Sequence, residues 1–74
     1  MKDAYDLYEV PERLNNYVIQ ESKPSRNHES CRVIRGRKSR TEYVTAIYRA
    51  GRSWSWGNYF DNAKDATSDY DRRD

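Results

Sequence analysis

Aliphatic side chains are scarce in this sequence of 74 residues, which contains only ten Leu, Ile, Val and Phe residues in total. So low a fraction is typical of disordered chains when the net charge is large, but here the formal net charge is only +2. Seven Tyr and two Trp residues add apolar area, because each buried aromatic ring removes about 150–250 Å² of surface from water. We therefore predict one small domain whose core or interface contains most of the tyrosines and both tryptophans.

Cysteine and histidine are almost absent. Cys31 is the single cysteine, which excludes an intramolecular disulfide and is typical of a protein from a reducing compartment. His28 is the single histidine, and because a structural zinc site needs about four such ligands, we predict no metal or other cofactor. Glycine-rich phosphate-binding motifs and nucleophile motifs are also missing, which predicts that the protein is not an enzyme.

Long apolar runs are missing as well, and no stretch approaches the roughly 20 residues that a membrane-spanning helix needs. The first residues contain acidic side chains and no apolar segment, so they do not have the pattern of a signal peptide. From these absences we expect a soluble, cytoplasmic protein with no membrane partner.

Antiparallel strands are predicted where β-branched and aromatic residues are concentrated. Four segments share this composition: residues 16–22, 30–34, 42–50 and 53–60. Gly51 gives the last two strands a tight turn, so they are expected to form a β-hairpin. Residues 1–15 are ambiguous, apart from a helical turn that begins at Pro11.

The two tryptophans lie two residues apart in the last predicted strand. Simple alternation places Trp54, Trp56 and Phe60 on one face and Tyr59 on the other. Gly57 beside these large rings predicts a bulge or a close approach of the backbone. We therefore expect both indoles to lie on the same side of the sheet, in the core under a helix.

The last part of the chain, residues 61–73, has the pattern of a helix. Asp61 is the predicted N-cap. One apolar stripe runs along the helix: Ala63, Ala66 and Tyr70. The predicted fold class is therefore α+β. We expect a small antiparallel sheet of three to four strands within residues 16–60, with the C-terminal helix packed on one face. The whole chain, residues 1–74, is predicted to form a single domain.

Basic residues are concentrated in the middle of the chain, where residues 23–53 contain nine Lys and Arg residues against two Glu, while both ends are acidic. The segment around Gly36 is interpreted either as a basic hairpin tip or as a strand with a bulge. Beside aromatic strands it favours an anionic protein or single-stranded nucleic acid as partner, the alternative being a solvated strand edge that prevents aggregation. The candidate partner-binding residues are Arg35, Arg37, Lys38, Arg40, Tyr43, Arg49, Arg52 and Tyr59.

The chain resembles small phage-encoded inhibitors such as anti-CRISPR proteins. The resemblance covers its size, the predicted hairpin and helix of residues 43–73, and a surface rich in tyrosine and charged residues. This resemblance implies a non-catalytic interaction protein that binds and blocks a host nucleic-acid-handling complex, either a protein or a ribonucleoprotein. A small module that binds RNA or single-stranded DNA is the alternative function. A homodimer is a further expectation, because a chain of this size is marginally stable alone.

Overall fold

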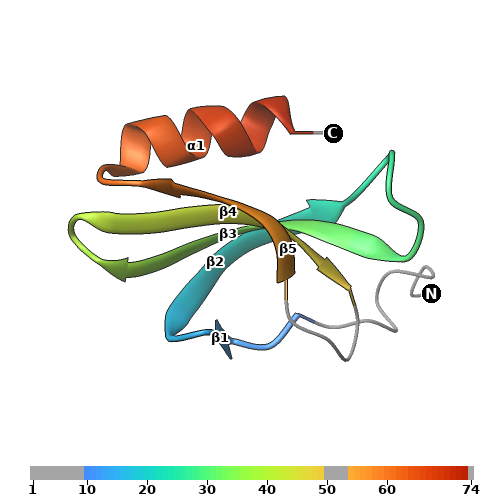
Figure 1. Ribbon diagram of the computed structural model, residues 1–74, viewed down its shortest axis with the longest axis horizontal. Helices are drawn as coiled ribbons and strands as arrows, with labels where there is room; N and C mark the ends of the chain where they lie inside the picture. The colour runs from blue at the N-terminus through green and yellow to red at the C-terminus, as the bar shows by residue number, and fades with distance from the viewer. Residues whose placement is uncertain (1–9, 50–53, 74) are drawn as a thin grey trace.

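The computed structural model describes residues 10–49 and 54–73, which form an antiparallel sheet and one helix (Figure 1). The elements are β1 (Arg13–Leu14), β2 (Tyr17–Pro24), β3 (Cys31–Ser39), β4 (Glu42–Arg49), β5 (Trp54–Phe60) and α1 (Ala63–Arg72). Each strand pairs antiparallel with the next, so the strand order in the sheet is the order in the sequence. The α+β class and the C-terminal helix are confirmed, and the sheet has five strands rather than three to four.

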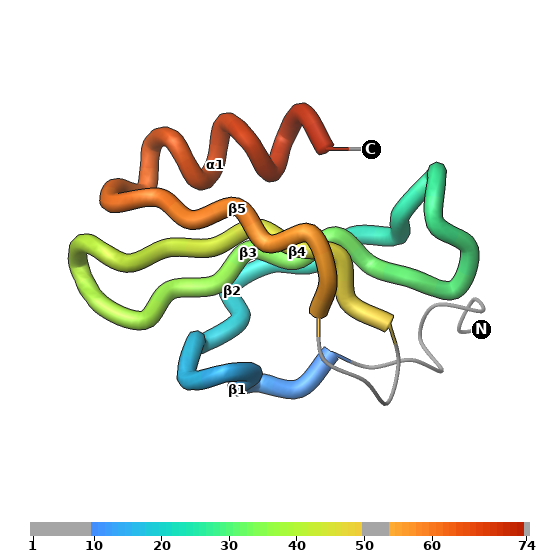
Figure 2. The backbone as a smooth tube through the Cα atoms, viewed as in Figure 1, coloured from blue at the N-terminus to red at the C-terminus, as the bar shows by residue number. Residues whose placement is uncertain are grey.

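The sheet is curled, and its two faces are covered by different parts of the chain (Figures 1 and 2). The helix α1 packs across β3, β4 and β5 on one face, which we call the helix face. On the other face, the concave face, the ring of Tyr17 from β2 meets that of Trp54 from β5 edge-on, with centroids 5.5 Å apart. Two strands separate β2 from β5 in the sheet, so this contact requires the sheet to bend toward the concave face.

The concave face contains the larger of two apolar clusters. Four of its side chains are buried: Ile34, Val44, Ala46 and Tyr48. Gly36 of β3 leaves no room for a side chain, because a Cβ atom built there would stand 3.1 Å from the Cβ of Tyr17 and 3.2 Å from Cγ1 of Val44. The prediction that rings dominate the core is therefore correct only in part, since fully buried aliphatic side chains form its centre.

The cluster on the helix face is formed by Cys31, Val33, Ile47 and Tyr70. Tyr70 comes from α1, and Ala66, one turn earlier, is also buried, so two residues of the predicted apolar stripe contact the sheet while the third, Ala63, is exposed. Burial of this stripe fixes the helix on the sheet, since a helix of ten residues is marginal by itself.

The N-cap of α1 is Asn62 rather than the predicted Asp61. The side-chain oxygen of Asn62 accepts a hydrogen bond from the backbone N–H of Asp65 at 2.8 Å. Both Asp and Asn are good N-caps. Asn62 is the cap here because it lies three positions before Asp65, whose backbone N–H needs an acceptor. Asp61 instead accepts a hydrogen bond from the Asn62 amide at 2.7 Å.

The structure corrects the expected helical turn at Pro11, and of the two interpretations of the basic segment it supports the continued strand. Instead of a helical turn after Pro11, the chain forms β1, which pairs with β2 through a two-residue turn. Asn15 and Asn16 occupy this turn with φ of 52° and 70°, and tight hairpins need such left-handed residues. The third strand continues through the basic segment as far as Ser39, so Arg35 and Arg37 lie within β3 rather than in a loop.

The expectation that both indoles share one face is also wrong. Ser55 pairs with Ile47 and Asn58 pairs with Thr45, so two residues of β5 stand opposite one residue of β4. Trp56 is the first residue of this bulge and has a φ of 54°. The bulge shifts the alternation: Trp54 stays on the concave face, while Trp56 lies 64% exposed beside the helix face. The turn expected at Gly51 lies outside the described residues.

Candidate binding surfaces

The predicted basic segment is partly neutralised by acids of the same chain. The side chain of Arg35 is only 15% exposed, with its Nη2 3.2 Å from Oε2 of Glu21 and its Nη1 donating to Oε1 of Gln20 at 3.2 Å. The Nζ of Lys38 lies 3.7 Å from Oε2 of Glu42. Two of the four basic candidates in this segment therefore already have anionic partners, which reduces the attraction of the segment for an external anion.

The other candidates of this segment occupy different environments. Arg37 donates a hydrogen bond to the carbonyl of Ser39 at 3.2 Å, and its guanidinium carbon lies 5.8 Å from the ring centroid of Tyr43. Tyr43 is buried, so it offers little surface to a partner. Arg40 is exposed in the β3–β4 turn and makes no hydrogen bond or ion pair with the residues that the structure describes. Arg52 lies outside those residues.

A different group of aromatic and basic side chains meets at the opposite end of the sheet. The β2–β3 loop and the C-terminal end of α1 lie on this side of the molecule (Figure 1). The rings of Trp56 and His28 stack with centroids 4.8 Å apart and an angle of 30° between their planes. A hollow of about 370 Å³ lies here, and we call its lining the Trp56 surface: Asn27, His28, Ile47, Trp56 and Arg73.

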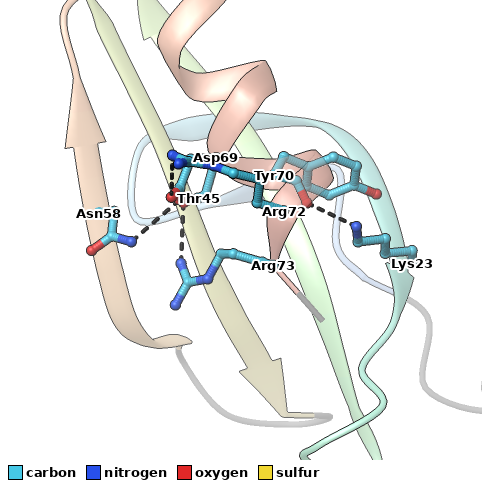
Figure 3. Close-up of polar contacts among 7 residues, drawn as sticks. All are labelled: Lys23, Thr45, Asn58, Asp69, Tyr70, Arg72 and Arg73. Atoms are coloured by element: carbon cyan, nitrogen blue, oxygen red, sulfur yellow. Dashed lines mark hydrogen bonds and ion pairs between the residues drawn. The ribbon is translucent and has the colours of Figure 1, made fainter.

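A polar network holds the bulge of Trp56 in place (Figure 3). Arg73, directly after α1, donates to the carbonyl of Trp56 at 2.7 Å and to Oγ1 of Thr45 at 3.1 Å. The Thr45 hydroxyl donates in turn to the Asp69 carboxylate, which also accepts from Nδ2 of Asn58 at 3.2 Å. Because Thr45 is completely buried on β4, the network ties α1, β4 and β5 together at one point.

Two exposed arginines lie near the Trp56 surface. Arg49 follows Ile47 by two residues on β4, so it lies on the same face of the sheet. Arg49 is exposed and has no hydrogen bond or ion pair within the described part of the chain, and the same holds for Arg26 in the β2–β3 loop. Of the sequence-predicted contacts, Arg49 is therefore the one that the fold brings to this surface.

The sequence reasoning missed Trp56, His28 and Arg73 as surface residues. Gly57 was the available signal, because a bulge at that position turns one neighbouring ring over to the other face. The contribution of Arg73 had no local signal, since its two partners are 28 and 17 residues away in the sequence.

A second hollow, of about 590 Å³, lies at the end of the sheet that carries the β3–β4 turn. We call it the tyrosine hollow, and its lining is Tyr17, Thr41, Glu42, Tyr43, Tyr59, Phe60, Asp61 and Asp65. Tyr59, a predicted contact, is 63% exposed here, and its ring centroid lies 6.4 Å from that of Tyr17. Burial and, to a smaller extent, the nearby Glu42 carboxylate raise the pKa of the Tyr17 hydroxyl.

Within residues 10–49 and 54–73, no three His, Cys, Asp or Glu side chains lie close enough together to hold a metal ion. Cys31 is buried in the cluster under α1. The helix in the described part of the chain is too short and too polar to cross a membrane.

Comparison of the chain with protein families, with curated proteins and with solved structures finds no match.

Proposed function

We propose that this protein is a non-catalytic binding protein that docks on its partner through the Trp56 surface. The observation that carries the proposal is an indole that is 64% exposed on a left-handed backbone. Such a conformation costs about 1–3 kcal/mol for a residue other than glycine, and residues of this kind cluster at functional sites. Tryptophan and arginine are also the residues that contribute most at protein interfaces.

The proposed partner is a protein surface with an acidic rim on a host nucleic-acid-handling complex, which the bound protein would block in the manner of an anti-CRISPR inhibitor. The exposed indole beside Ile47 supplies an apolar centre, and Arg49 and Arg26, which form no ion pair among the described residues, supply positive charge near it. An aromatic centre with a polar rim is the usual composition of a protein interface. The exposed Asp71 near the end of α1 also favours a protein over a continuous phosphate backbone.

Single-stranded nucleic acid is the second candidate, and one observation favours it. The stacked rings of Trp56 and His28 offer a platform next to Arg49. Bases stack on such rings with about 1–3 kcal/mol each, and the guanidinium would neutralise a phosphate.

The test is the substitution Trp56→Asn, because asparagine tolerates the left-handed conformation and should leave the fold intact. Tagged wild-type protein is expected to capture a stoichiometric complex from host lysate, and Trp56→Asn to lower its affinity at least tenfold, as is typical of a central interface residue. Val18→Asn, which replaces an exposed apolar side chain on β2 outside both hollows, is the matched control. Equal binding by Trp56→Asn and wild type would contradict the proposal.

Titration with short single-stranded oligonucleotides separates the two candidates. Quenching of tryptophan fluorescence that weakens steeply with added salt and disappears in Trp56→Asn would assign the surface to nucleic acid instead. Absence of quenching at low salt removes that alternative.

A further inference from the structure

We infer that the tyrosine hollow binds an arginine side chain of a partner protein. This second site is separate from the Trp56 surface, because the two hollows share no residue and lie at opposite ends of the sheet. Three observations support it: the rings that line the hollow, two carboxylates beside them that form no ion pair within the described residues, and a guanidinium of this chain that already lies over one of the rings.

The rings come from three strands. Tyr17 from β2 and Tyr59 from β5 form a tilted pair, and Phe60 and Tyr43 complete the lining. The face of an aromatic ring carries partial negative charge and attracts a cation within about 6 Å of its centroid. Tyr59 is 63% exposed, so its ring is available to a side chain entering from solvent.

Three acidic side chains and no basic side chain are among the residues that line the hollow. Asp61 and Asp65 both accept hydrogen bonds from Nδ2 of Asn62, at 2.7 and 2.9 Å. Neither forms an ion pair with any residue in the described ranges, whereas Glu42 is paired with Lys38 at 3.7 Å. Because the Asn62 oxygen caps α1, its amide is held in one orientation and keeps the two carboxylates together.

Arginine fits this combination better than lysine. Its planar guanidinium can stack on a tyrosine ring and donate to two carboxylate groups at the same time, whereas an ammonium group is a compact point charge. The guanidinium carbon of Arg37 lies 5.8 Å from the Tyr43 ring centroid, so one ring that lines the hollow already has a guanidinium over its face.

The probe for this site is the blocked tripeptide acetyl-Gly-Arg-Gly-amide, compared with its citrulline counterpart, which has nearly the same shape but no charge. Titration followed by ¹H–¹⁵N NMR is expected to shift the amide signals of Tyr59 and Asn62 with saturation at roughly millimolar concentration, as befits so small a ligand. Asp61→Asn and Asp65→Asn should each weaken binding several-fold, because a charge-assisted hydrogen bond is lost. Asp71→Asn, an exposed carboxylate at the other end of α1, is the matched control.

Trp56→Asn should leave the affinity for the tripeptide unchanged, so the failure of one site does not imply the failure of the other. Equal binding of the citrulline peptide, or no shift at all, would overturn the inference. A dimer in solution that Arg40→Gln abolishes would also overturn it, because the occupant would then be a second copy of this chain.

Discussion

Replacement of Thr45 by valine tests the polar network that joins the helix to the sheet and holds the bulge of Trp56. Valine has the shape of threonine and an equal preference for strands, so the substitution removes the hydroxyl and little else. Two hydrogen bonds are lost, one donated to Asp69 and one accepted from Arg73. Both of these charged groups keep other partners, since Asn58 still donates to Asp69 and Arg73 still donates to the Trp56 carbonyl.

The expected loss follows from these contacts. A hydrogen bond to a charged group contributes about 1.5–3 kcal/mol to stability, and here no buried charge is left without a partner. We therefore expect Thr45→Val to lower the free energy of unfolding by about 2 kcal/mol. For a domain of this size each kcal/mol changes Tm by about 4–8 °C, so Tm should fall by about 8–16 °C.

The assay is thermal and urea unfolding followed by circular dichroism, with Thr67→Val as the matched control. Thr67 lies half-buried on α1 and makes no hydrogen bond through its side chain with other described residues. Surface substitutions commonly change the free energy of unfolding by about 0.5 kcal/mol. If the free energies of unfolding of Thr45→Val and Thr67→Val differ by no more than this, the reasoning is refuted. A double-mutant cycle with Asp69→Asn then measures the coupling between hydroxyl and carboxylate directly.

Two further predictions concern the concave face and the helix. Gly36→Ala should destabilise the protein by about 1–3 kcal/mol in urea unfolding, because the new methyl group would stand 3.1 Å from the Cβ of Tyr17. That Cβ atom cannot move without its backbone. Unchanged stability would show that β2 does not pack so closely against β3. Burial raises the pKa of Tyr70 to about 12, so the folded state keeps this proton to higher pH than the unfolded chain, in which the pKa is about 10. The contribution of Tyr70 to stability is therefore complete below pH 10 and declines between about pH 10 and 12. The free energy of unfolding of Tyr70→Phe should decline less than that of the wild type over this range. Identical declines in the two proteins would contradict the assignment.

Much of the fold could be predicted because its signals are local. The β-branched residues of β4 and the apolar stripe of α1 depend on neighbours within one strand or one helix, and both elements are found where their patterns indicated. The candidate surfaces could be predicted less well. Arg35 was expected to be available to a partner, but its charge is compensated by Glu21, which is 14 residues away in the sequence and comes into register only when β2 pairs with β3.

Composition and periodicity by themselves determined the α+β class, the hairpin of β4 with β5 and the docking of the helix through Ala66 and Tyr70, because each follows from burying one face of one element. The tertiary structure alone decided which ring reaches solvent. One extra residue in β5 reverses the alternation, and Arg73 at the far end of the chain stabilises the resulting left-handed Trp56. A bulge changes every facing residue beyond it, and the contact that fixes it lies 17 residues away, beyond the reach of any local pattern.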